Sequence, residues 1–404
     1  MPILMSGGSP RIMGEWRTFP AWWDMDVLRE YALLALRIDR LVTEHPSGTW
    51  ILDYRGPDPW RAEVAAEPLP NPADLVRRAE DLAASVADDV ALTEQIGALH
   101  TMARQLSGEK LSLHEQVRGM LGIDVDWIPD EQFDEAYQLL DEGLPDMKGS
   151  LAQRMHAWRA NHSLPPGRTA RLSELVQRAV AETITRTTTL FPLPENIEVT
   201  CEFASGPFRG LYRGDTRGTL FIDPQLPFNL ADLFYVVAHE AFPGHICEFM
   251  IKQLHLADRP DIQTRFMPSP AYLVSEGLGL HAQQLLFPDD QAQRWLIDNV
   301  DELQQDSSDY AKIHRARNIL WSAYCNAAFL VAQQKPWSEV RTYLAETALL
   351  ADDELAYLEG MYGTPFLEPY IFTYYHGYRL LQPHLSDPNF LRRVLTEQLP
   401  VSLL

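Results

Sequence analysis

The chain has 404 residues, of which 46% are hydrophobic and 22% are charged, a composition typical of a folded globular protein and not of a disordered one. Its formal net charge of −22 opposes nucleic acid and anionic membranes by repulsion, so we expect neither as a partner. Three cysteines, no apolar stretch long enough to span a membrane and no secretory signal in Met1–Arg11 together predict a cytoplasmic protein.

Helical periodicity dominates the first half of the chain. Apolar residues recur at helical spacing over 26–42, over 73–102 and over 172–180. Asp130 stands where it can cap a further helix whose inner face includes Phe133. These stripes are most simply core-facing surfaces, and they predict a mainly α fold.

The pattern changes near residue 191, where Phe191-Pro192-Leu193-Pro194 should end the preceding helix. Residues 196–223 then alternate β-branched and aromatic residues with glycines, which predicts a small antiparallel sheet with tight turns. Helical patterning resumes at Leu230. We therefore expect an N-terminal helical platform over 1–195 and a catalytic half over 196–404, packed together because no linker separates them. Within that half we expect metal-site helices over 229–286 and C-terminal helices over 290–400.

The segment from Tyr235 to His245 carries the strongest chemical signal. It contains His239-Glu240-Ala-Phe-Pro-Gly-His245, and Asn229 is placed to cap the helix that precedes it. A catalytic zinc site takes three protein ligands, histidine nitrogens and carboxylate oxygens, and leaves a position for water. Two histidines with a glutamate after the first can supply two of these ligands and a base for the water. We therefore predict one zinc ion per chain, with His239 and His245 as ligands and Glu240 as general base.

The spacing of the two histidines departs from the usual helical rule. Histidines four residues apart share one helix face, whereas residues six apart on a regular helix point roughly 120° away from each other. Pro243 removes a helix hydrogen bond and clashes with the carbonyl group of His239, and Gly244 tolerates unusual backbone angles. We expect this Pro-Gly pair to form a bulge that turns His245 toward the metal.

Glu276 is the best candidate for the third ligand. It follows His245 by 31 residues, which allows the first helix to end and a second to return beside it, and it lies among apolar residues where an unpaired carboxylate is costly. Glu248 and Asp289 are the alternatives. Glu248 lies on the motif helix itself, and Asp289 follows a proline, which predicts a turn there.

The string His-Glu-Ala-Phe-Pro-Gly-His, followed by the Glu-Gly pair, resembles the bacterial domain-of-unknown-function family numbered 885. Members of that family carry His-Glu-x-x-Pro-Gly-His and are regarded as zinc metallopeptidases of the gluzincin type. The resemblance covers roughly 196–381 and implies a helical array with a small sheet edging the active-site cleft. It also assigns ligand positions to His239, His245 and Glu276, the base to Glu240, and a C-terminal Tyr-x-x-Gly tyrosine to Tyr374.

The chain departs from the family pattern around this motif. Ile246 replaces a histidine that often follows Pro-Gly-His, which leaves His245 as the ligand. The positions after Glu-Gly and on a later helix also differ, and here they hold Leu278, His281, Gln283, Trp321 and Cys325. These departures place the substrate class in question more than the metal site.

Zinc would lower the pKa of a bound water, and Glu240 would take its proton as it attacks a carbonyl carbon. Tyr374 is the candidate donor to the oxyanion, with Tyr375 and His376 behind it. His281 could donate to a ligand carboxylate. On the predicted sheet, Arg209, Tyr212 and Arg213 could bind the substrate backbone or a carboxylate.

The leading hypothesis is thus a metallopeptidase that acts on a peptide or small amide substrate. A zinc hydrolase of non-peptide amides or esters and a catalytically inactive helical binding scaffold are the alternatives. A di-iron carboxylate bundle is disfavoured because no Glu-x-x-His pair occurs in the chain.

Overall fold

The computed structural model describes residues 25–404 apart from 46–47, 165–166, 258 and 365. The fold over these residues is mainly helical, as predicted. Residues 1–11, for which we expect no secretory signal, lie outside the described part. Within the described ranges, no helix is both long and apolar enough to cross a membrane.

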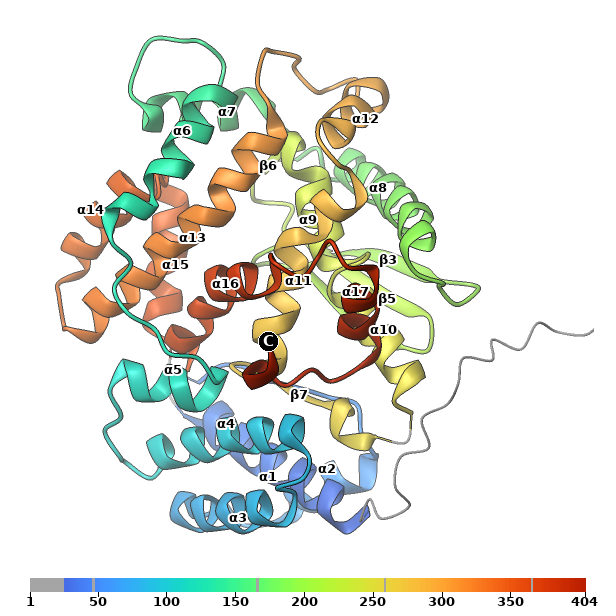
Figure 1. The fold of residues 1–404 in the computed structure, drawn as a ribbon, viewed down its shortest axis with the longest axis vertical. Coiled ribbons are helices and arrows are strands. Elements are labelled where there is room, and N and C mark those ends of the chain that lie inside the picture. The colour runs from blue at the N-terminus through green and yellow to red at the C-terminus, as the bar shows by residue number, and fades with distance from the viewer. Residues whose placement is uncertain (1–24, 46–47, 165–166, 258, 365) are drawn as a thin grey trace, which may run out of the picture.

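The first half of the chain forms a set of helices, blue to green in Figure 1. They are α1 (Met25–Glu44), α2 (Asp58–Ala66), α3 (Pro72–Ser85), α4 (Val90–Leu106), α5 (Leu113–Leu121), α6 (Asp134–Gly143), α7 (Leu151–His162) and α8 (Thr169–Leu190). The predicted helical stretch 73–102 is divided in two, because the side chain of Asp89 accepts the Leu92 N–H and starts α4 there. The prediction for Asp130 is wrong. It lies in a 3-10 turn (Asp130–Gln132) and does not cap α6.

The predicted sheet forms where expected but is mixed. Its strands are β3 (Glu198–Phe203), β4 (Arg209–Gly214) and β5 (Arg217–Ile222), in the order β3-β5-β4. β4 and β5 form the antiparallel hairpin that the glycine-rich turn predicts, but β3 pairs with β5 in parallel. The prediction of a wholly antiparallel sheet is therefore wrong, because β5 inserts between the two strands that precede it. The order of strands in a sheet cannot be inferred from the alternation of residues or from the turn residues.

The second half of the chain supplies the remaining helices. They are α9 (Leu233–Glu240), α10 (His245–His255), α11 (Pro270–Leu286), α12 (Gln291–Asn299), α13 (Tyr310–Ala332), α14 (Trp337–Thr347), α15 (Asp352–Tyr362), α16 (Leu367–Leu381) and α17 (Pro388–Thr396).

Two short strand pairs join the halves of the chain. β1 (Leu52–Tyr54) pairs with β7 (Thr264–Phe266), and β2 (Ser163–Leu164) pairs with β6 (Phe228–Asn229), both antiparallel. The halves therefore pack together as expected. The boundary at residue 195 stays a prediction.

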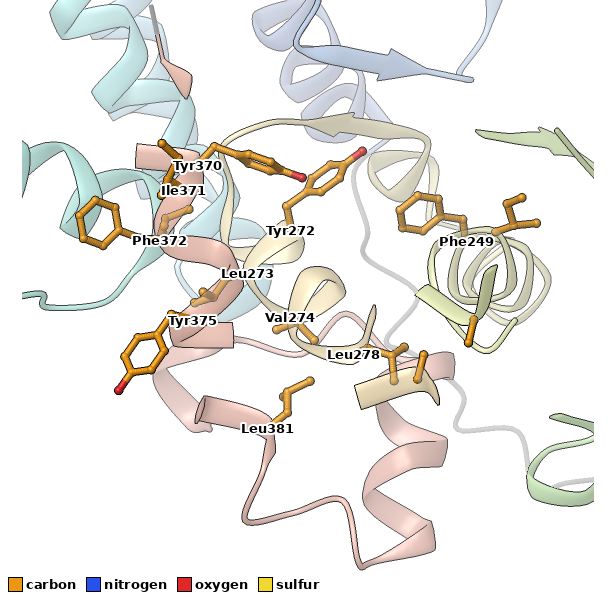
Figure 2. Packing of buried hydrophobic residues seen from close by; sticks show 14 of the residues in the cluster. Phe249, Tyr272, Leu273, Val274, Leu278, Tyr370, Ile371, Phe372, Tyr375 and Leu381 are labelled. Atoms are coloured by element: carbon orange, nitrogen blue, oxygen red, sulfur yellow. The ribbon is translucent and has the colours of Figure 1, made fainter. Parts of the chain in front are cut away.

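α9 and α11 lie near the middle of the molecule, between the N-terminal helices and α13 to α16 (Figure 1). Most residues of α11 are buried. Leu273 and Val274 of α11 and Ile371 of α16 belong to the packed core between these helices (Figure 2). α11 and α16 approach closely where Gly277 meets Gly377. A Cβ on Gly277 would lie only 2.4 Å from the carbonyl oxygen of Gly377, so the contact requires glycine there. This contact brings the residue before Gly277, which is Glu276, next to α16.

Candidate metal centre

The turn between α9 and α10 aligns the two histidines. Asn229 caps the segment before α9 as predicted, its side chain accepting the Ala231 N–H at 3.0 Å. α9 ends at Glu240 and α10 begins at His245, so the predicted bulge within one helix is instead a break between two.

Two hydrogen bonds across this break each span six residues. The Gly244 N–H donates to the Ala238 carbonyl at 3.0 Å, and the Cys247 N–H donates to the Ala241 carbonyl at 2.9 Å. Residues six apart are thereby stacked, as residues four apart are in a regular helix. Position 244 requires glycine, because a Cβ there would lie 1.7 Å from the His239 carbonyl oxygen.

The three predicted ligands converge. Glu276, from the middle of α11, places Oε2 3.1 Å from His239 Nε2 and Oε1 3.4 Å from His245 Nε2. The two imidazole rings are perpendicular, with centroids 4.8 Å apart. His239, Glu240 and His245 form a group whose candidate ligand atoms all lie within 4.8 Å of one another, so these residues could hold a metal ion.

The arrangement fits zinc. Zinc–ligand distances of about 2.0–2.1 Å at tetrahedral angles place ligand atoms about 3.3 Å apart, close to the two nitrogen–oxygen separations above. Glu276 is 2% exposed, and among the described residues its Oε2 has no well-aligned hydrogen-bond donor, although His239 Nε2 lies 3.1 Å away. A buried carboxylate oxygen without a well-aligned donor is costly, and a cation shared with the histidines would satisfy it.

Electrostatics at the site favour positive charge. Burial raises the pKa of Glu276, but the two histidines outweigh it and hold this pKa well below its usual range. Burial lowers the pKa of His245, but Glu276 and the other nearby carboxylates outweigh it and raise that pKa to about 9. Carboxylates that hold protons on buried imidazoles in this way provide a site suited to a metal cation.

Glu240 lies beside the ligands and is held by the sheet. The Gly210 N–H of β4 donates to Glu240 Oε2 at 2.7 Å, so the strand orients the carboxylate. Burial is the main cause of the raised pKa of Glu240, and Glu276 adds to it, whereas His239 and His245 lower it. A carboxylate with a raised pKa is a better proton acceptor, as a general base requires.

A buried relay supports His245 from behind. Ser275 Oγ lies 2.9 Å from His245 Nδ1 and donates to Glu248 Oε2, while Lys252 Nζ donates to Glu248 Oε1 at 2.5 Å. Because the single hydroxyl proton of Ser275 goes to Glu248, Ser275 Oγ accepts the Nδ1–H of His245. This leaves Nε2 free to bind metal. Glu248, the alternative third ligand, thus lies in the relay.

Asp289, the other alternative ligand, is exposed in a turn after α11 with φ 56°. The motif spacing gave no indication of Ser275 as a partner of His245. It precedes Glu276, and only the position of α11 against α10 reveals its role.

Tyr370 is a further residue that the sequence did not reveal. Its hydroxyl donates to Glu276 Oε1 and so orients the ligand carboxylate. It lies four residues before Tyr374, and both rings project from one face of α16. Their centroids are 5.7 Å apart. Burial raises the pKa of Tyr374, and Glu276 and Glu240 add to this, which is consistent with its predicted position beside the metal centre.

The remaining candidates on α11 and α16 lie elsewhere. His281 stacks on Tyr378, and its Nε2 donates to the Tyr378 carbonyl at 2.9 Å, so it contacts α16 instead of a ligand carboxylate. Tyr375 points away from Tyr370 (Figure 2) and donates to Gln132 Oε1 at 2.9 Å. His376 packs against Tyr375, and burial lowers its pKa to about 4.

The candidates on the sheet have mainly structural contacts. The guanidinium of Arg209 lies 4.6 Å from the Phe221 ring centroid. Tyr212 is buried, and its hydroxyl donates to the Asp215 carbonyl at 2.9 Å. Arg213 donates to Thr219 Oγ1 at 3.0 Å. The sheet contributes the Gly210 N–H to the site, which the sequence did not indicate.

Comparison with known proteins adds a likeness of fold. No family model matches this sequence, and no curated protein matches it. The fold is similar to the crystal structure described as "the putative lipoprotein from Colwellia psychrerythraea", with a TM-score of 0.53 and 15% sequence identity over 82% of this chain. The match covers 61% of that protein, so the present chain spans less than two thirds of it. At this identity the likeness concerns the fold alone.

Proposed function

We propose that this protein is a zinc-dependent hydrolase that cleaves peptide bonds, with one zinc ion per chain held by His239, His245 and Glu276. The observation that carries the proposal is the position of the Glu276 carboxylate, 3.1 and 3.4 Å from the two histidine nitrogens, with Glu240 beside them. The same arrangement supports the proposed relationship to the family numbered 885.

The bound ion would act as a Lewis acid and lower the pKa of a water molecule. Glu240 accepts the proton of the attacking water and passes it to the leaving amine. The Gly210 N–H keeps one Glu240 oxygen fixed. Tyr374 donates a hydrogen bond to the oxygen that gains charge on the substrate carbonyl.

Metal content tests the first half of the proposal. Elemental mass spectrometry of the purified protein should find about one zinc per chain, and His245→Ala should lose it. His281→Ala is the matched control, because it removes a buried histidine of α11 whose ring contacts Tyr378. Wild-type protein that stays metal-free after zinc addition would overturn the proposal.

Turnover tests the second half. Glu240→Gln should keep the zinc and lose peptide cleavage in a mixed peptide library, since the amide cannot accept the water's proton. A panel of simple amides and esters beside the library distinguishes peptide hydrolysis from the non-peptide alternative. Cleavage that survives in Glu240→Gln would show that the assigned base is wrong.

A further inference from the structure

One stripe of α13 differs from the residues around it. Between Ala316 and Phe329 the residues are buried except Arg317, Trp321 and Tyr324, which are spaced at four and then three residues and keep partial exposure. Such spacing places them on one face of the helix. Two partly accessible aromatic residues in an otherwise buried stretch of helix need an explanation beyond core packing.

This stripe is joined to the metal centre by a series of ring contacts. Tyr370 donates to Glu276 and meets Tyr374 edge to face. Tyr374 stacks on Trp321 with centroids 4.1 Å apart and 13° between the ring planes. The ring centroids of Trp321 and Tyr324 are 4.3 Å apart, so a row of aromatic rings connects the carboxylate ligand to α13.

We propose that Trp321, with Tyr324 beside it, forms a specificity site that takes an aromatic side chain of the substrate next to the scissile bond. The inference rests on the proposed function, since it names the substrate class of the same centre. Trp321 stacks on Tyr374, the assigned oxyanion donor, so a substrate bound at the metal centre extends its neighbouring side chain along the row.

The charges around the row favour an uncharged aromatic group. Arg317 begins the stripe and is held by Asp232, because its Nη1 donates to Asp232 Oδ1 at 2.6 Å. Its guanidinium lies 5.0 Å from the centroid of the Tyr235 ring on α9. The Asp232 carboxylate is thus already paired and offers little to a lysine or arginine side chain, whereas aromatic rings gain from offset or edge-on contacts with other rings.

The test uses three ligands that share one metal-binding group: the hydroxamates of N-acetylated phenylalanine, alanine and lysine. Their dissociation constants are measured by calorimetry on the zinc-loaded full chain. The phenylalanine compound should bind wild type roughly tenfold more tightly than the other two, and Trp321→Leu should reduce this preference to about twofold or less. Trp321→Phe, which keeps a ring, should retain most of it.

Trp127→Leu is the matched control. Trp127 is 43% exposed, and its ring meets Tyr343 of α14, so this variant should keep the wild-type preference. Equal binding of the three compounds, a preference for lysine, or a phenylalanine preference unchanged in Trp321→Leu would overturn the aromatic site while leaving the metal centre in place. If no hydroxamate binds, the metal centre fails and the inference falls with it.

Discussion

Ser275→Ala should weaken zinc binding as well as destabilise the fold. Ser275 is 1% exposed, and its hydroxyl stands between His245 Nδ1 and the Glu248 carboxylate. Removing it leaves both groups without that partner, which should cost about 1–3 kcal/mol of unfolding free energy. Loss of a group that orients a metal-binding histidine typically weakens metal affinity about 10- to 100-fold, equivalent to about 1.4–2.8 kcal/mol.

Ser322→Ala separates the two effects. Ser322 is also fully buried, but its hydroxyl donates to the Ile319 carbonyl of its own helix at 2.6 Å. Zinc affinity is measured by competition with a chromophoric chelator, and stability by thermal unfolding of both variants without metal. We expect both to lose stability and only Ser275→Ala to lose affinity. A wild-type zinc dissociation constant in Ser275→Ala would refute the assigned relay.

Gly279→Ala should weaken zinc binding, because a Cβ would lie 2.6 Å from His239 Nδ1, whereas Gly360→Ala, which meets nothing within 4 Å, should not; equal zinc affinities would contradict this. Asp232→Asn should cost about 1–3 kcal/mol near neutral pH, measured by denaturant unfolding, because it leaves the partly buried guanidinium of Arg317 without its carboxylate. Burial raises the pKa of Asp232, but its basic partners hold it below the ordinary value, so its contribution is complete above the unfolded pKa of about 3.9 and is lost as pH falls further. The deficit of Asp232→Asn should therefore shrink in acid, and a constant deficit would speak against this cause. A chelator should lower the Tm of wild type and leave that of His245→Ala unchanged; a similar drop in both would mean that the stabilising metal binds elsewhere.

The sequence predicted those site residues that can be recognised from their spacing and their immediate neighbours in the chain. His239, Glu240 and His245 lie in one short string, and Glu276 stands out as a carboxylate in an apolar helix. The structure brings these four side chains together. The mainly α class followed in the same way from helical periodicity, which is a local property.

The groups that hold those side chains could not be predicted, since tertiary packing decides them. Tyr370 reaches Glu276 only because α16 crosses α11 at two glycines. Ser275 and Glu248 meet because α10 and α11 lie side by side. A serine that precedes a glutamate in the sequence does not by itself predict this contact. The parallel pairing of β3 with β5 was missed for the same reason, because the pairing partner lies beyond the next strand along the chain.

The Pro-Gly pair shows how a motif can predict correctly which side chains come together and predict their local backbone geometry wrongly. A bulge would have kept one helix and rotated His245, whereas the chain ends α9 and starts α10 with His245 as its first residue. Proline suits this break because it has no N–H to leave unpaired, and glycine is required by the approach of its backbone to the His239 carbonyl. The spacing of six is thus not a stretched form of the spacing of four. It reflects a wider turn, closed by hydrogen bonds of its own, that performs the same alignment of two imidazoles.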